Sequence, residues 1–254
     1  QKLKLSDIQF EKAFVVEPSS ESNFQVHLRP HSDTSYLIES YSKKSESNFE
    51  KHASCVGMRL VEKDCQDYNF SELMQDKSII TDPSALFPYS NLDAEQAHHY
   101  FWFESIYRTS HGLVAKLRHP DYETETKGYR FYPGQMDAAN LLGFALIDSF
   151  SSVEDGFYIP RTAESLELLS EGSSIRWVYA ELRKDCDNSV FDATYFADSG
   201  RVVATLSGVK GTVLNRSILE RLIFSQRTKD AVYSPKWVEL AQSTTDAETE
   251  HKID

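Results

Sequence analysis

Hydrophobic and polar residues alternate along the first 60 positions of the chain. A run that begins at Leu3 ends at Pro18, and further alternating runs follow at residues 24–28, 35–41 and 49–60. Polar turn residues separate these runs. A period of two with such breaks is typical of antiparallel strands, so the first block is predicted to be a strand followed by a three-stranded meander.

Residues 61–91 lose this alternation and become polar, with Pro83 and Pro88 among them. We expect a long surface crossing here that holds one short helix. A second block of strands follows, and its first clear strand is predicted at residues 112–117.

The later strands of the second block are bounded by turn residues. A segment at residues 157–168 contains Pro160, which cannot donate a hydrogen bond to a neighbouring strand, so it is predicted to be kinked or to lie at an edge. Asp198-Ser199-Gly200 has the composition of a hairpin turn. The remaining strands are expected at residues 174–183, 190–197 and 201–213, and a closing helix at 216–224.

The one long helical pattern lies between these strands. Pro133-Gly134 is typical of a loop, and after Gln135 apolar residues recur at helical spacing over about three turns. They are Met136, Ala139, Leu142, Gly143, Leu146 and Ile147. The pattern predicts a helix that is buried on most of its circumference.

This spacing places Asp137 in the first turn of the predicted helix. An acid there has two readings: it caps or balances the unpaired N–H groups and the helix dipole, or it points into a cavity between the helix and the sheet. The spacing alone does not choose between them.

The second block is thus expected to wrap its sheet around one helix, whereas the first block has matching strands and no helix of its own. An apolar sheet face has to be covered. The first block therefore either shares the core of the second block or is covered by a helix that precedes Gln1. Without that cover, its exposed apolar surface would exceed what a monomer normally shows.

Composition narrows the class of protein. The 254 residues are 40% hydrophobic and 12% aromatic, which is enough for a real core. The net charge of -12 argues against nucleic acid and acidic membrane surfaces as partners. No apolar run is long enough to span a membrane and the N-terminus lacks a signal pattern, so a soluble cytoplasmic protein is expected.

Cysteine and histidine spacing gives no sign of a metal site. The three cysteines, Cys55, Cys65 and Cys186, form no C-x-x-C pair, and the pair His98-His99 has no third ligand at metal spacing. We expect structural thiols, no metal and no cofactor.

Several segments, taken in order, resemble the dehydratase domain of modular polyketide synthases and related fatty acid synthases. FEKHASCVGMRL, at residues 49–60, resembles the family's W-x-x-H-A-x-G-x-L strand. GYRFYPGQMDAA, at 128–139, resembles the second catalytic motif, G-Y-x-x-H-P-x-x-L-D-A-A. YIPRTAESLEL, at 158–168, is similar to L-P-F-S-W-x-x-V-R-L, and AVYSPKWVEL, at 231–240, is similar to the linker that follows such domains. The resemblance extends over nearly the whole chain up to Leu240.

The resemblance implies a fold of the α+β class, a double hot-dog with antiparallel sheets wrapped around a buried helix, in which the first hot-dog helix is missing from this chain. It also implies loss of water from a 3-hydroxyacyl group on an acyl carrier protein. A His removes the proton next to the thioester carbonyl, and an Asp protonates the departing hydroxyl. Matched residue by residue, that acid is Asp137. An apolar site would raise its pKa and so allow it to act as a general acid.

The chain departs from the family pattern at four places. The base motif H-x-x-x-G-x-x-x-x-P is absent, and the base is expected to lie upstream of this chain. Leu141 stands where the family has a Gln or His that orients the acid, and Tyr132 stands where it has His. His99-Tyr100-Phe101 replaces Tyr-Gly-Pro. These changes leave two alternatives to a dehydratase: a silent structural domain of a megasynthase, or a double-bond isomerase.

The resemblance also gives candidate substrate contacts and boundaries. The contacts are Tyr132, Pro133, Leu141, His99, Trp102 and Phe103, with plain core packing as the alternative for the aromatic ones. The boundaries are residues 1–96 for a partial first hot-dog and crossing segment, 97–216 for the second hot-dog, 217–240 for the closing helix and linker, and 241–254 for a disordered tail. The partners implied are an acyl carrier protein with a phosphopantetheine-linked substrate, neighbouring synthase domains and a second copy in a homodimer.

Overall fold

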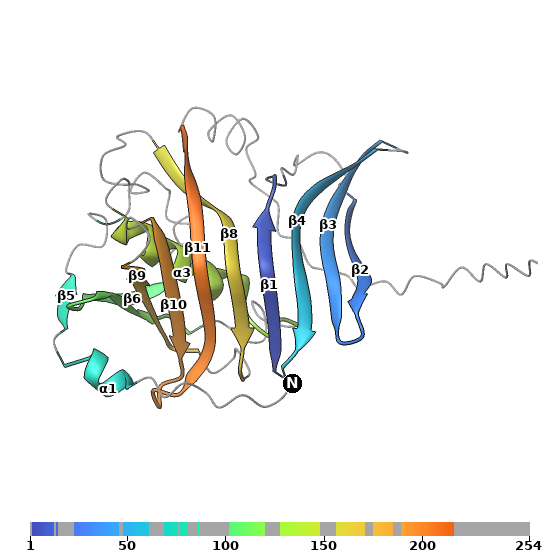
Figure 1. Cartoon of the computed structure of the whole chain (residues 1–254). Helices are drawn as coiled ribbons and strands as arrows, with labels where there is room; N and C mark the ends of the chain where they lie inside the picture. Colours follow the sequence, from blue (N-terminus) through green and yellow to red (C-terminus); the bar gives the residue numbers. More distant parts are fainter. Residues whose placement is uncertain are drawn as a thin grey trace, which may run out of the picture.

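The computed structural model describes residues 2–12, 14, 23–45, 48–60, 69–75, 77–80, 86, 102–119, 128–147, 156–170, 175–184 and 189–215. Their strands form a single eleven-stranded sheet in the order β2-β3-β4-β1-β8-β11-β10-β9-β7-β6-β5 (Figure 1). Every pairing is antiparallel. The predicted closing helix and polar tail lie outside the described residues.

The first block of the sequence supplies one end of this sheet, as predicted. Its strands are β1 (Leu3–Phe10), β2 (Phe24–Ser32), β3 (Ser35–Ser45) and β4 (Asn48–Arg59). Strands β2, β3 and β4 form the expected meander. Strand β1 then joins the two blocks, because it pairs with β4 on one side and β8 on the other.

The second block supplies the rest of the sheet and the long helix. Its elements are β6 (Phe103–Arg108), β7 (Gly112–Leu117), α3 (Pro133–Leu146), β8 (Gly156–Leu168), β9 (Trp177–Leu182), β10 (Val190–Phe196) and β11 (Val202–Asn215). The predicted turn between β10 and β11 is confirmed: Gly200 has φ of 81° and donates its N–H to the carbonyl of Ala197 at 2.9 Å.

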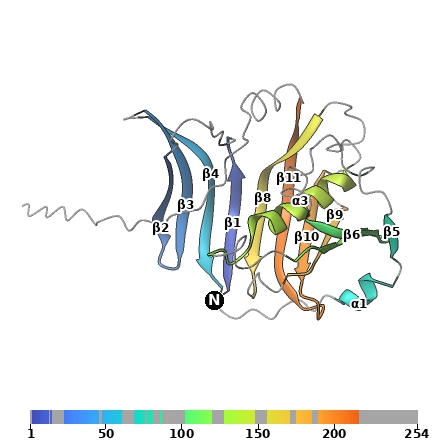
Figure 2. The ribbon, with the colours of Figure 1, turned by 180° about the vertical axis from the view of Figure 1, so that it is seen from behind.

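Helix α3 covers one face of the second block. It packs on β7, β9 and β10, and Figure 2 shows it in front of the second-block part of the sheet. Gly143 allows a close approach to β10, since a Cβ atom at this position would lie 2.3 Å from the Phe191 ring. Phe144 meets the same ring edge-on, with centroids 5.4 Å apart. The buried helix predicted from the sequence is therefore confirmed.

The face that α3 covers continues into the first block. Leu5 and Ile8 of β1 pair with Leu166 and Ala163 of β8, and all four belong to the main core. Asp7, between them, has φ of 52° and lies where the β1–β4 register shifts. Because of this irregularity, Leu5 and Ile8 lie on the same side of the sheet although they are three positions apart.

Toward β2 this same face loses its cover. Gly57 contacts both Leu5 and Ile38, and Ile38 lies opposite Leu28 of β2. Leu28 is 61% exposed, and Phe24 on the same face of β2 is 49% exposed. Neither of the described helices lies over β2, β3 and β4 (Figure 2). The exposed apolar face expected from the sequence is present in the part of the chain that the structure describes.

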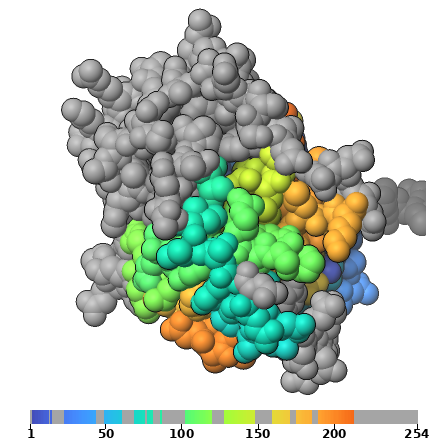
Figure 3. Space-filling view, turned by 90° about the vertical axis from the view of Figure 1, so that its left-hand side faces the viewer, coloured from blue at the N-terminus to red at the C-terminus, as the bar shows by residue number. Residues whose placement is uncertain are grey.

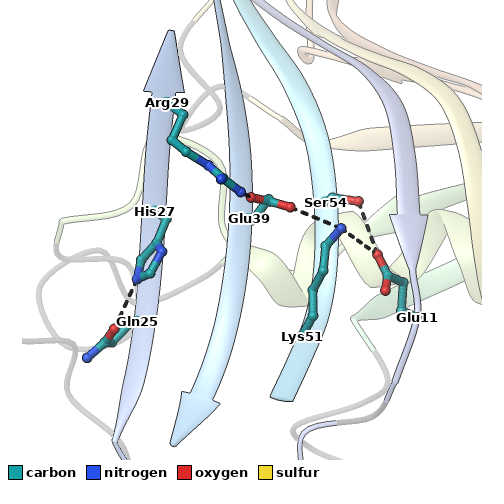
Figure 4. Close-up of polar contacts among 7 residues, drawn as sticks. All are labelled: Glu11, Gln25, His27, Arg29, Glu39, Lys51 and Ser54. Atoms are coloured by element: carbon teal, nitrogen blue, oxygen red, sulfur yellow. Dashed lines mark hydrogen bonds and ion pairs between the residues drawn. The ribbon is translucent and has the colours of Figure 1, made fainter. Parts of the chain in front are cut away.

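The opposite face of β2, β3 and β4 is polar. Glu39, which is 6% exposed, pairs with Arg29 and with Lys51, whose Nζ lies 3.1 Å from Glu39 Oε1 (Figure 4). Lys51 also pairs with Glu11 at 2.8 Å. Charges arranged in this way suit a face in water, so the apolar side of these strands is the side that needs a partner.

The crossing segment returns to the far end of the sheet. Its short helix α1 (Phe70–Leu73) agrees with the prediction, and β5 (Ser78–Ile80) pairs with β6 at the edge. Phe70 packs on Trp177 and Phe196, at 5.5 and 4.9 Å between ring centroids. Residues of α1 and β5 form much of the surface at this end (Figure 3). Phe70 and Leu73 of α1 pack against a small second core on the face away from α3, whereas Ile80 of β5 packs against the main core.

The prediction for Pro160 was wrong in part. Strand β8 is neither broken nor at an edge, because it lies between β1 and β11. Pairing with β1 stops at Thr162, and the β11 register shifts between Lys210 and Gly211, opposite Pro160. A proline is tolerated in a central strand where one neighbour is absent and the other strand has a bulge.

We expect Gly143→Ala to lower the free energy of unfolding by about 1–3 kcal/mol through overpacking against Phe191, although Ala is the better helix former by about 1 kcal/mol. Urea denaturation measures the difference. As a control, Phe191→Leu in the same background should recover part of the loss. Strict additivity of the two substitutions would contradict the proposed contact.

Candidate active site on helix α3

The start of α3 differs from the sequence prediction. Pro133 and Gly134 are the first two residues of the helix rather than a loop before it, and Tyr132 is its N-cap, with an extended backbone at φ -69° and ψ 127°. Proline suits the first helical position because its missing N–H would have no partner there. Asp137 is consequently the fifth helical residue and not a member of the first turn.

The capping role for Asp137 is therefore wrong. The Tyr132 side chain makes no capping hydrogen bond to the helix, and no acid lies in the first turn of α3. Asp137 is half-buried and its Oδ1 accepts a hydrogen bond from Asn140 Nδ2 at 3.2 Å. Burial raises the pKa of Asp137 above its usual value, and the bond from Asn140 opposes this in part. The side chain can thus hold a proton at a higher pH than an exposed carboxyl.

Tyr195 lies beneath this part of the helix. It comes from β10, is fully buried, and donates its hydroxyl to the carbonyl of Met136 at 2.8 Å. Phe131 packs edge-on against its ring at 4.9 Å. Burial, and secondly the charge of Asp137, raise the pKa of Tyr195 well above its usual value. Tyr195 is therefore a neutral hydrogen-bond donor that attaches the helix backbone beside Asp137 to the sheet.

The aromatic candidates gather at the N-terminus of α3. Trp102 is 1% exposed, and its ring centroid lies 4.8 Å from that of Tyr132. A Cβ at position 134 would lie 2.3 Å from Trp102 Nε1, so the close packing here requires Gly134. The Arg118 guanidinium lies 3.4 Å from the Trp102 centroid on the other side. Trp102 thus belongs to the core that supports the start of the helix.

The other candidate contacts are more scattered. Phe103 and Leu141 are half-buried and pack against the main core, and Pro133 is exposed. Leu141 lies one turn after Asp137, so the two side chains are neighbours on the helix surface. His99 lies outside the described residues. Leu141 therefore lies on the same helix as Asp137, Tyr132 is the N-cap of that helix, and Trp102 packs against its start.

Five histidines lie among the described residues, on or beside the strands. His52 uses both ring nitrogens, with the carbonyl of Lys12 at 3.0 Å and Ser42 Oγ at 2.7 Å. His27 lies on the polar face of β2, beside Gln25 (Figure 4). His31, His111 and His119 are exposed. The hydrogen bonds of His27 and His52 are thus made to groups other than Asp137.

Sequence reasoning missed Asn140 and Tyr195. Asn140 could have been found, because a residue three positions after an acid lies next to it on a helix. Tyr195 could not, since it is 59 positions from Met136 and only the packing of β10 on α3 brings them together.

The described residues contain no group of three or more His, Cys, Asp or Glu side chains arranged to hold a metal ion. In the same part of the chain, every helix falls short of the length and hydrophobicity that a membrane crossing needs. Cys55 is a free thiol, whereas Cys65 and Cys186 lie outside the described residues.

Comparison with known proteins gives the family. The family model described as polyketide synthase dehydratase N-terminal domain matches residues 92–221, just over half of the chain. The chain belongs to the polyketide synthase dehydratase family. The matched residues include α3, Asp137 and all of the second-block strands around them. No curated protein matches the sequence.

Solved structures of dehydratase domains share the fold. The domain from the CurJ module of curacin polyketide synthase superposes with a TM-score of 0.69 at 19% identity, covering 86% of this chain and 77% of that one. The CurK domain gives 0.73 at 14% identity, with 85% and 77% covered. The dehydratase domain of PpsC from Mycobacterium tuberculosis gives 0.67 at 16%, with 84% and 75% covered. The double hot-dog fold expected from the sequence is confirmed.

We expect Asp137→Asn to stabilise this dehydratase-family domain at neutral pH and to have little effect in acid. The folded-state pKa of Asp137 is raised, so the carboxyl favours folding below its unfolded value of about 3.9, and that contribution is lost as the pH rises through the folded value.

Urea unfolding of both proteins at about pH 4 and about pH 8 measures this effect. The stability difference between variant and parent should grow with pH. A difference that is the same at both values would show that the Asp137 carboxyl is not shifted by burial.

Proposed function

We propose that this chain acts in a polyketide synthase by eliminating water from a 3-hydroxyacyl group carried on an acyl carrier protein, with Asp137 as the general acid. The observation that carries the proposal is the half-buried carboxyl of Asp137, whose pKa is raised, on the helix that the dehydratase family match includes. A general acid must keep its proton near neutral pH, and burial shifts the pKa of Asp137 in that direction.

In this reaction a base takes the proton from C2, the carbon next to the thioester carbonyl. The electrons of that C–H bond form the C2=C3 double bond as the C3–O bond breaks. Asp137 gives its proton to the departing oxygen, which leaves as water. Asp137 ends as a carboxylate and the base ends protonated, so one proton transfer between them restores the site.

The base is proposed to lie outside the described residues. His52 is occupied by Lys12 and Ser42, and the remaining described histidines lie on the polar face or at exposed positions. The apolar face of β2, β3 and β4 is on the same side of the sheet as α3, and neither described helix covers it. An element that covered this face would lie on the same side of the sheet as Asp137.

Two solved structures of one dehydratase, the CurK domain, support a pair of catalytic groups. One structure is of an inactive CurK mutant in which an aspartate is replaced by asparagine, and another is of an inactive CurK mutant in which a histidine is replaced by phenylalanine. By analogy, Asp137→Asn should remove the activity of this chain.

The finer assignments belong to the same proposal. The acyl carrier protein, the neighbouring synthase domains and a cytoplasmic location follow from the polyketide synthase context. Tyr132, Pro133, Leu141, Trp102, Phe103 and His99 remain the candidate substrate contacts, and the division at residue 96 remains the proposed boundary between the two hot-dogs.

A silent structural domain is the second candidate. The observation that favours it is Leu141, an apolar residue where the family has a polar partner for the acid. Such a domain would keep the fold and lose the reaction.

Mass spectrometry of a 3-hydroxyacyl carrier protein tests the proposal. The substrate is incubated with this chain, with a form extended toward the N-terminus where the natural sequence allows it, and with Asp137→Asn in whichever form is active. A dehydratase gives a loss of one water, and we expect Asp137→Asn to reduce the rate by about 100-fold or more, as for loss of a general acid.

The outcomes separate the candidates. If only the extended form is active, the base lies upstream of this chain. If this chain is active without the extension, the base lies among residues 1–254. No loss of water from either form, with both folded by circular dichroism, would support the silent domain. An active protein that is unaffected by Asp137→Asn would overturn the assignment of the acid.

A further inference from the structure

We propose that Asn140 is the positioning residue for Asp137, in place of the polar side chain that Leu141 lacks. This inference rests on the proposed function of Asp137 and goes beyond it, since no motif of the sequence pointed to Asn140. It predicts that the orienting partner has moved by one position along α3, from four residues after the acid to three.

The contact itself is direct. Asn140 Nδ2 donates to Asp137 Oδ1 at 3.2 Å, and both residues are half-buried on the same flank of α3. Residues three and four positions apart are neighbours on a helix, so either spacing can place an amide beside the acid. Asn is a poor residue for the interior of a helix because its side chain competes for backbone groups. Here the amide bonds to the acid instead.

The effect on Asp137 is both geometric and electrostatic. A bond to Oδ1 limits rotation of the carboxyl and leaves Oδ2 available for the substrate. A donor to the carboxyl also stabilises its charged form, and Asn140 opposes the rise in pKa that burial causes. Burial and the Asn140 bond therefore shift the pKa of Asp137 in opposite directions. Such a balance suits a group that has to give a proton and regain it.

The strands beneath α3 supply only one other titratable group on this side. Tyr195 of β10 faces the helix and bonds to Met136 O. Lys116 of β7 pairs with Glu104, Glu181 of β9 bonds to Tyr179, and Asp192 of β10 pairs with Arg183. Strand alternation puts these three on the face away from α3, since the neighbours Ala115, Ala180 and Phe191 belong to the core beneath it.

The test uses Asn140→Ala, and the double variant Asn140→Ala with Leu141→Gln. The first removes the donor, and the second restores one at the position that the family uses. Asn69→Ala is the matched control, because Asn69 makes a bond of the same kind to Glu72 three residues later, on helix α1.

The first readout is the pKa of Asp137, followed by carbon NMR of labelled aspartate carboxyls and assigned by its absence in Asp137→Asn. Asn140→Ala should raise this pKa, the double variant should return it toward the parent value, and Asn69→Ala should leave it unchanged. This measurement does not depend on enzymatic activity. An unchanged pKa in folded Asn140→Ala would overturn the inference, whatever the function of the chain.

The second readout is the rate of water loss. Asn140→Ala should lower kcat/KM by about tenfold, as for loss of one hydrogen bond to a charged group. It should also move the alkaline limb of the pH profile to higher pH, because the acid loses its proton later. The double variant should restore both kcat/KM and the position of the alkaline limb. A shifted pKa without water loss from either this chain or the extended form would reject the dehydratase proposal and keep the Asn140–Asp137 link.

Discussion

The structure depends on the need to bury the apolar face of one long sheet. Eleven antiparallel strands share that face, and α3 covers the part made by β7, β9 and β10. The helix can approach closely because Gly143 and Gly134 leave space for Phe191 and Trp102. Over β2 the described residues meet this requirement only in part, since Phe14 packs on Phe24 while Phe24 and Leu28 stay largely exposed. Burial thus accounts both for the well-formed half of the molecule and for the half that needs a partner.

The chemistry of the site follows from where this packing puts one carboxyl. Asp137 lies at the border of the buried surface of α3, where desolvation favours its neutral form. Full burial without a partner would make ionisation too costly for a group that has to lose its proton and regain it. Asn140 supplies that partner, and Tyr195 holds the helix backbone beside it. The carboxyl of Asp137 is therefore partly shielded from water and accepts a hydrogen bond from the Asn140 amide.

The other face of β2, β3 and β4 carries charged side chains in place of apolar ones. Glu39, Arg29, Lys51 and Glu11 form a chain of ion pairs across β2, β3 and β4 (Figure 4). Glu39 itself is buried, and the exposed part of the Arg29 side chain places the edge of this charged face in water. The apolar face of β2, β3 and β4 thus lies on the same side of the sheet as α3, and the charged face lies on the opposite side.

The sequence by itself determined the elements whose signals are local. A period of two predicted the strands, a helical period predicted α3, and Asp198-Ser199-Gly200 predicted the β10–β11 turn. The motif at residues 128–139 pointed to Asp137 and to the family. Only the tertiary structure decided that Pro160 lies in a central strand, that Asp137 is past the first turn, and that Tyr195 supports it. These features depend on neighbours distant in the chain, and periodicity carries no information about which distant residues meet or how much water they exclude.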